Sequence, residues 1–190
     1  MYFENRAAAG TILAQQMVDS YRYENCVVVA LGDGGVLVGE QIAVALHCLL
    51  TMLVIEDIEV PGESTSFGGV SQSGNFTYND AFSAGEIDEY TSEFHGYLEE
   101  KKREAFQKIN RLIGDGGVID HEMLRDHVVI LVSDGLDNGA TIDVAIDFLK
   151  PIRLQRLVIA TPLAVCQQLI NYTWLLTNFT SWTSKRILWA

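Results

Sequence analysis

A buried strand, an acid and the start of a helix follow one another within residues 128–141 of this 190-residue chain. Residues 128–132 are all apolar and mostly β-branched, which favours a strand that is covered on both faces. Asp134 follows, and from Ile142 apolar residues recur every three or four positions, as in an amphipathic helix. Ligands of open parallel sheets bind beyond the carboxyl ends of strands, so this segment predicts a binding site.

The loop between this strand and helix carries the candidate chemistry. Asp134 could bind sugar hydroxyls or a hydrated Mg²⁺, since hard cations prefer carboxylate oxygens, and Asp137 could act as a base. Gly139 and Thr141 leave backbone N–H groups at the helix start to meet an anion. The alternative is structural: one acid caps the helix and the other makes an Asx turn.

A second strand–glycine–helix unit lies near the amino terminus. An apolar run at 26–31 ends in Gly32–Gly35, and a helix is predicted over 36–46. The dinucleotide fingerprint fails because Leu37 replaces a required glycine, and the P-loop fails because Glu40 replaces its lysine. Two interpretations stay open: a plain tight turn, or a turn that admits a ligand close to the backbone.

The alternation of strand and helix patterns predicts an α/β fold with a parallel sheet. Further helices are predicted at 6–20 and 86–113, further strands at 51–55 and 156–161, and a loop or short antiparallel hairpin at 61–85. One domain is expected over 1–190, with a core to about residue 165 and a C-terminal hood or tail over about 166–190 that contains a short helix and several tryptophans.

Composition narrows the class of protein. The formal net charge of −12 argues against a nucleic-acid or anionic-membrane binder, because no basic stripe is present. The longest apolar region, 42–55, is too short to span a membrane, and no signal-peptide pattern is seen, so a cytoplasmic protein is expected. Cys26, Cys48 and Cys166 lie far apart, which predicts buried thiols without a metal site or disulfide.

Several segments together resemble the type I phosphoribosyltransferases. Residues 129–141 match the family's strand, acid and small-residue loop, although the acidic pair is incomplete. Phe3 and Arg6 resemble the opening of a bacterial branch with poorly defined substrates, residues 31–35 its pyrophosphate loop, and residues 158–164 its last core strand. The resemblance covers about residues 1–165 in the right order.

This resemblance implies a three-layer α/β sandwich with a central parallel sheet of about five strands, flanking helices and a small hood. It also implies that a nucleophile, often a nucleobase nitrogen, displaces pyrophosphate from C1 of phosphoribosyl pyrophosphate (PRPP) with Mg²⁺ present. PRPP or another phosphorylated small molecule is therefore the expected partner. The aromatic C-terminal segment would suit either packing in the hood or the surface of a homodimer.

Carried over by position, Asp134 would contact the ribose hydroxyls and, through PRPP, Mg²⁺. Asp137 matches the base of purine-using members. The pyrophosphate would face Asp33, Gly34 and Gly35. The 5′-phosphate would be held by the loop residues Ser133, Asp137, Asn138, Gly139, Ala140 and Thr141.

The chain departs from the family pattern at four places. Ser133 replaces the first acid, Asn138 replaces a threonine, Asp33 replaces an arginine, and Glu56 and Asp57 stand where basic residues are usual. A unit charge pair at about 4 Å is worth roughly 1 kcal/mol in water and about 4 kcal/mol at an effective dielectric of 20, so these reversals weaken PRPP binding. Two functions follow as hypotheses: a phosphoribosyltransferase with impaired activity, or a non-catalytic ligand sensor or interaction module.

Overall fold

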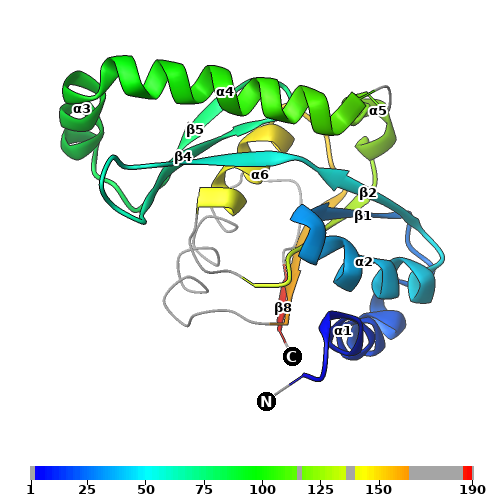
Figure 1. Cartoon of the computed structure of the whole chain (residues 1–190). Coiled ribbons are helices and arrows are strands. Elements are labelled where there is room, and N and C mark those ends of the chain that lie inside the picture. The colour runs from blue at the N-terminus through cyan, green and yellow to red at the C-terminus, as the bar shows by residue number, and fades with distance from the viewer. Residues whose placement is uncertain (1–2, 115–116, 136–139, 163–185, 190) are drawn as a thin grey trace. The chain divides into compact units, whose positions relative to one another are not determined.

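The computed structural model describes residues 3–114, 117–135, 140–162 and 186–189, the last of these by backbone alone (Figure 1). The chain divides into two compact units. The first, here called the parallel-sheet unit, comprises Met1–Met52, Ile119–Asp137 and Ile152–Ala190. The second, the antiparallel-sheet unit, comprises Leu53–Val118 and Asn138–Pro151.

The parallel-sheet unit contains a five-stranded sheet in the order β2-β1-β6-β7-β8. Its strands are β1 (Cys26–Leu31), β2 (Leu49–Leu53), β6 (Val128–Val132), β7 (Arg156–Thr161) and β8 (Arg186–Trp189). Strands β1, β6, β7 and β8 pair in parallel, with Val28 opposite Ile130 and Ile130 opposite Val158. The predicted parallel sheet is thus confirmed, and β1, β6 and β7 have the predicted bounds.

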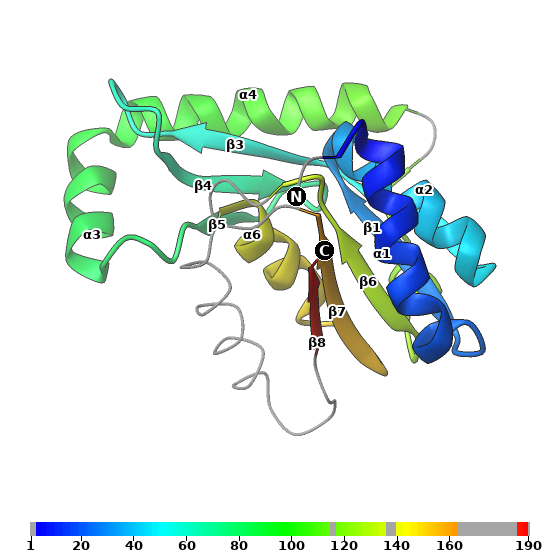
Figure 2. The ribbon, with the colours of Figure 1, turned by 90° about the horizontal axis from the view of Figure 1, so that it is seen from below.

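Two helices, α1 (Arg6–Tyr21) and α2 (Gly32–Leu46), pack side by side on one face of this sheet (Figure 2). The core between them and the strands is mostly aliphatic, because Leu13 and Met17 of α1 and Ile42 of α2 point inward. A short helix, α5 (His121–Leu124), precedes β6. Cys26 is buried and Cys48 half-buried, both as free thiols; Cys166 lies outside the described residues.

The connection from β1 to α2 is tighter than the sequence pattern indicated. A glycine turn over Gly32–Gly35 was expected before a helix at 36, but α2 already begins at Gly32. Gly32 has a φ of 69°, which a residue without Cβ adopts readily, so the chain leaves the strand within one residue. Asp33, Gly34 and Gly35 therefore lie in the first turn of the helix. Their N–H groups have no carbonyl partner within the helix and point beyond its amino-terminal end.

The antiparallel-sheet unit consists of three layers. Its sheet, in the order β3-β4-β5, contains β3 (Ile55–Glu59), β4 (Ser66–Ser71) and β5 (Phe76–Tyr78). Figure 1 shows α4 (His95–Ile113) along one face of this sheet and α6 (Ala140–Leu149) on the other. This small antiparallel sheet forms the hood, which was expected from the sequence at about 166–190 and is instead formed by residues within 53–118 and 138–151. Of the two alternatives for 61–85, the structure has the antiparallel hairpin.

A cluster of aromatic rings surrounds one buried residue of this unit, Phe67. Phe67 is fully buried and contacts the rings of Phe76, Tyr78, Phe82 and Tyr90 at centroid distances between 5.4 and 6.5 Å. The contacts with Tyr78, Phe82 and Tyr90 are edge-on, a geometry that adds to the stabilisation from burial.

The helix predicted over 86–113 is instead two helices. A capping box of Ser83 and Glu86 starts α3 (Ala84–Glu93), and Phe94 leaves helical geometry with φ −109° and ψ 23°. The Phe94 ring stacks on Tyr90, so tertiary packing of the aromatic residues accompanies a break that the polar pattern could not show. Gly114 caps α4, as expected from the glycine-rich stop after residue 113.

Two further expectations concern chain segments at the unit boundaries. The strand predicted at 51–55 falls on the end of β2 and the start of β3, which belong to different sheets.

The tail helix and most of the aromatic segment lie in 163–185, outside the described residues, whereas 186–189 form β8 at the edge of the larger sheet. No helix within the described ranges combines the length and apolar character of a membrane span.

Candidate functional site

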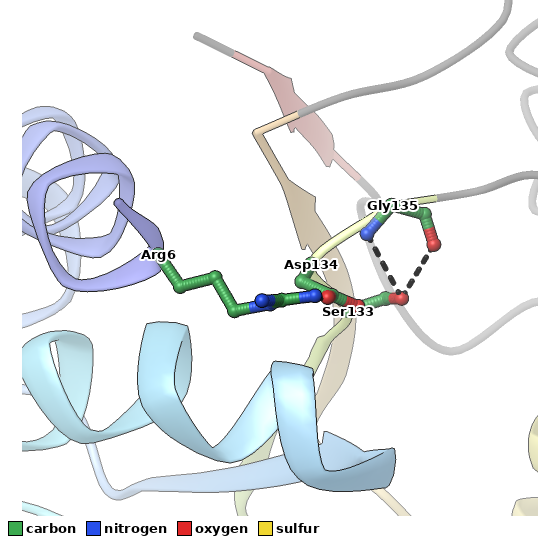
Figure 3. A network of polar contacts seen from close by, with 4 residues as sticks. All are labelled: Arg6, Ser133, Asp134 and Gly135. Carbon is green, nitrogen blue, oxygen red and sulfur yellow. Dashed lines mark hydrogen bonds and ion pairs between the residues drawn. The ribbon is translucent and has the colours of Figure 1, made fainter. Parts of the chain in front are cut away.

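Asp134 lies immediately beyond the carboxyl end of β6, where the sequence predicted the site. Figure 3 shows Arg6 reaching from the start of α1 to this carboxylate: Arg6 Nε donates to Asp134 Oδ2 at 2.6 Å. The start of α1 is fixed by Asn5, whose side-chain oxygen accepts a hydrogen bond from the Ala8 N–H at 2.8 Å. The side chains of Arg6 and Asp134 are 59% and 31% exposed, so the pair is open to solvent and to a ligand.

The first turn of α2 packs directly against the end of β6. A Cβ placed on Gly34 would overlap the Asp134 carboxylate, and one placed on Gly35 would lie 2.6 Å from the Val132 carbonyl oxygen. The two segments that the sequence singled out, 33–35 and 133–135, are therefore brought together within one unit. Asp33 occupies the same helical turn and is exposed.

The close approach of α2 to the end of β6 predicts opposite effects on stability for two glycine-to-alanine substitutions in helices. Gly35→Ala is expected to lower the free energy of unfolding by about 1–3 kcal/mol, because a backbone carbonyl cannot move aside as a side chain can. Gly96→Ala in α4, where nothing lies within 4 Å, is the control and is expected to stabilise by roughly 0.5–1 kcal/mol. Urea unfolding measures both; equal effects would contradict the packing of α2 on β6.

Ser133, at the position of the family's first acid, uses its hydroxyl within the turn. Ser133 Oγ donates to the Gly135 carbonyl at 2.6 Å and accepts from the Gly135 N–H at 3.4 Å (Figure 3). The residue is 8% exposed. This local bonding fixes the turn from which the Asp134 side chain projects.

The amino-terminal end of α6 belongs to the antiparallel-sheet unit. Ala140 is buried, and Thr141 Oγ1 donates to Asp57 Oδ2 on β3 at 3.3 Å. The hydroxyl expected to bind a phosphate is thus bonded to a carboxylate. Residues Asp137, Asn138 and Gly139, which were predicted to form the rest of the phosphate loop, lie outside the described residues.

The two acids of β3 have different surroundings because successive side chains of a strand point to opposite faces. Glu56 pairs with Lys108 of α4 at 2.7 Å, whereas Asp57 contacts Thr141 of α6. Loss of surrounding water raises the pKa of the Asp57 carboxyl, the Thr141 hydrogen bond opposes this rise, and the charges of Glu56 and Glu59 add to it. Asp57 therefore holds a proton more readily than an ordinary aspartate.

A buried acid that the sequence pattern did not bring to notice lies two residues after Thr141 in α6. Asp143 is 8% exposed, and its Oδ2 accepts a hydrogen bond from the Asp80 N–H at 3.2 Å. Burial raises the pKa of Asp143 to about 7; the bond from Asp80 N–H opposes this rise and the Asp80 charge increases it. The sequence signal that could have indicated its burial is its place between Ile142 and Val144 in a mostly apolar helix.

The described residues contain no cluster of three or more histidine, cysteine or acidic side chains able to hold a metal ion. Mg²⁺ is commonly held by one or two carboxylates together with substrate phosphates, and it retains several waters. A solvent-open carboxylate such as Asp134 fits that mode of binding.

Comparison with known proteins identifies relatives of this arrangement. A family model for the phosphoribosyl transferase domain matches residues 2–171. Protein TT1426 from Thermus thermophilus has a similar structure, with a TM-score of 0.69 and 21% identity over 100% of this chain and 85% of that one.

Two further solved structures share the fold. Protein AQ2163 from Aquifex aeolicus gives a TM-score of 0.55 at 12% identity, over 97% of this chain and 73% of that one. A hypoxanthine phosphoribosyltransferase from Staphylococcus aureus gives 0.52 at 13% identity, over 98% and 72%. At these identities the structural likeness establishes the fold alone.

Proposed function

The chain belongs to the phosphoribosyl transferase family, and on that premise we propose that it transfers the phosphoribosyl group of PRPP to a nucleobase-like acceptor, releasing pyrophosphate. The observation that supports this most is the position of Asp134, at the carboxyl end of β6 and against the first turn of α2. A carboxylate accepts hydrogen bonds only, which suits two vicinal ribose hydroxyls.

The pyrophosphate end of PRPP would lie at the start of α2. The N-cap residue, Leu31, has no side chain that can bond the first N–H groups, so those of Asp33, Gly34 and Gly35 are left to meet an anion. Gly34 also keeps the backbone close to Asp134, so one ligand could reach both.

The 5′-phosphate would lie at the start of α6. The Thr141 hydroxyl and the backbone N–H groups at the start of α6 are the proposed donors, together with the loop residues 137–139 that the family motif supplies. Phosphate would have to draw the Thr141 hydroxyl away from Asp57.

In the proposed reaction an acceptor nitrogen attacks C1 of the ribose. The C1–oxygen bond breaks, its electron pair leaves with pyrophosphate, and the proton of the acceptor passes to Asp137 as the base. When bound, Mg²⁺ would neutralise charge on the leaving pyrophosphate. Asp134 holds the ribose so that C1 faces the acceptor.

Titration of the full chain with PRPP and Mg²⁺ in a calorimeter tests this proposal, followed by measurement of pyrophosphate release with a panel of purines and pyrimidines. Saturable binding together with acceptor-dependent release supports it. An absence of PRPP binding would contradict it.

A second candidate is a non-catalytic ligand sensor, favoured by one specific observation. Thr141 is bonded to an acid, Asp57, and a further acid, Asp33, occupies the start of α2, so negative charge stands at both places where phosphate is proposed. Weak or absent binding of PRPP with Mg²⁺ to the folded chain would favour this second candidate, because these acids repel phosphate, whereas tight binding would contradict it.

Asp57→Asn is expected to tighten binding of ribose 5-phosphate by about five- to tenfold, because it removes a negative charge beside the proposed phosphate site. The amide oxygen can still accept from Thr141. Glu59→Gln is the control, because it removes an exposed charge from the same strand and leaves the Asp57–Thr141 hydrogen bond in place. Calorimetry measures both affinities; equal affinities in Asp57→Asn and the wild type would contradict a phosphate site at the start of α6.

A further inference from the structure

We propose that Arg6 is the cation that binds the pyrophosphate end of PRPP in this chain, and that Asp134 holds it in place until the substrate arrives. This assignment rests on the proposed function. It adds a substrate-binding residue from α1, outside the two loops that the family motif supplies.

The distribution of charge in the parallel-sheet unit supports Arg6 first. The described basic side chains of this unit are Arg6, Arg22, Arg125, Arg153 and Arg156. All except Arg6 lie at the amino ends of strands, because each closely precedes or begins β1, β6 or β7. Among the described residues of the unit, Arg6 is therefore the one basic side chain placed at the carboxyl edge, where Asp33 has replaced the expected arginine.

The position of Arg6 in its own helix is the second support. Arg6 is the first residue of α1, whose first turn contains no acid. A positive charge there opposes the helix dipole, which favours anions at the amino terminus. Because an arginine is unfavourable at the start of a helix, its presence beside the proposed ligand site indicates a functional role.

The third support is the position of the Arg6 guanidinium beside Asp134 and α2. Arg6 Nε contacts Asp134 Oδ2, and the same oxygen lies where a Cβ of Gly34 would be, so the guanidinium is close to the first turn of α2. Among the described residues, Arg6 bonds through Nε alone, which leaves the Nη donors for a ligand. When ribose hydroxyls bond to Asp134, the guanidinium can turn to the adjacent phosphates, for which its planar set of donors is suited.

Calorimetry with magnesium pyrophosphate, Mg²⁺–PRPP and ribose 5-phosphate tests this assignment on the full chain. Arg6→Gln is expected to weaken pyrophosphate and PRPP binding by about tenfold to a hundredfold, since a charge-assisted hydrogen bond is lost. Ribose 5-phosphate binding is expected to be retained or tightened, because Asp134 no longer has a competing partner.

Two variants serve as controls. Arg22→Gln removes the same charge from the other end of α1 and is expected to leave all three affinities within about twofold of the wild type. Arg6→Lys keeps the charge but not the planar set of donors, and is expected to bind pyrophosphate with intermediate affinity. It also keeps the test decisive should Arg6→Gln fail to fold, which circular dichroism would show.

The outcomes separate this inference from the proposed function. Equal PRPP and pyrophosphate affinities in the wild type and Arg6→Gln would overturn the assignment of Arg6 alone. A parallel loss of ribose 5-phosphate binding would also overturn it, because Arg6 would then merely position Asp134. Arg6-dependent binding of pyrophosphate without any binding of PRPP would contradict the proposed function and support the assignment. Binding of none of the three ligands would overturn both.

Discussion

Asp134→Asn is expected to lower kcat/KM for PRPP by about 100-fold, with little change in the folded structure. The wild-type carboxylate can accept two hydrogen bonds from ribose hydroxyls, and bonds to a charged acceptor are worth about 1.5–3 kcal/mol each. The amide offers one weaker acceptor, and its NH₂ group would face the Arg6 guanidinium. Steady-state pyrophosphate release and calorimetric titration with Mg²⁺–PRPP measure the effect.

The matched control is Asp126→Asn. Asp126 is another exposed acid of the same unit that is paired with an arginine, Arg153, at 3.1 Å, but it precedes β6 instead of following it. Its positive φ of 57° suits asparagine equally well. A loss shared by both variants, or an unchanged kcat/KM in Asp134→Asn, would show that the site does not lie at the carboxyl end of β6.

Asp143→Asn is expected to remove a pH dependence from the stability of the protein. In the folded state the pKa of Asp143 is about 7, whereas the ordinary value is 3.8. Between these values the folded protein keeps a proton that the unfolded chain releases, so the stability contributed by protonated Asp143 is full below about pH 4 and is lost as the pH rises through 7. The difference corresponds to roughly 4 kcal/mol above pH 7.

The variant has a neutral side chain at every pH, and its carbonyl oxygen can still accept from the Asp80 N–H. Its free energy of unfolding should therefore match that of the wild type near pH 4 and exceed it increasingly up to pH 8. Urea unfolding across this range measures the difference, with Asp88→Asn on the exposed surface of α3 as a control. A difference between Asp143→Asn and the wild type that does not change with pH would contradict a buried, protonated Asp143.

Much of the candidate site was predictable because its residues lie in short stretches of sequence. The β-branched run of β6 and the placement of Asp134 after it follow from local pattern and from the rule that ligands bind beyond strand ends. Three departures from the family pattern could also be read from the sequence, because the motif fixes which residue is usual at each position. They are Ser133 in place of the first acid, and the acids Asp33 and Asp57 in place of basic residues. The bond of Ser133 to Gly135 spans two residues, and it explains locally what the substituted side chain does.

Other parts of the site depend on partners that no local pattern specifies. Arg6 and Asp134 are 128 residues apart, and Asp57 and Thr141 are 84 apart, so each contact exists only once the units have folded. In the sequence Glu56 and Asp57 look like one acidic pair, whereas in the folded strand Glu56 pairs with Lys108 and Asp57 accepts a hydrogen bond from Thr141.

The sequence by itself determined the α/β class, the bounds of β1, β6 and β7, and the position of Asp134, because apolar periodicity and turn residues act over a few neighbours. The tertiary structure alone decided which charges meet, how tightly α2 packs on β6, and that Asp143 is buried. Those properties depend on the distances between segments remote in the chain and on the removal of water around a carboxyl group, and neither is a property of local sequence.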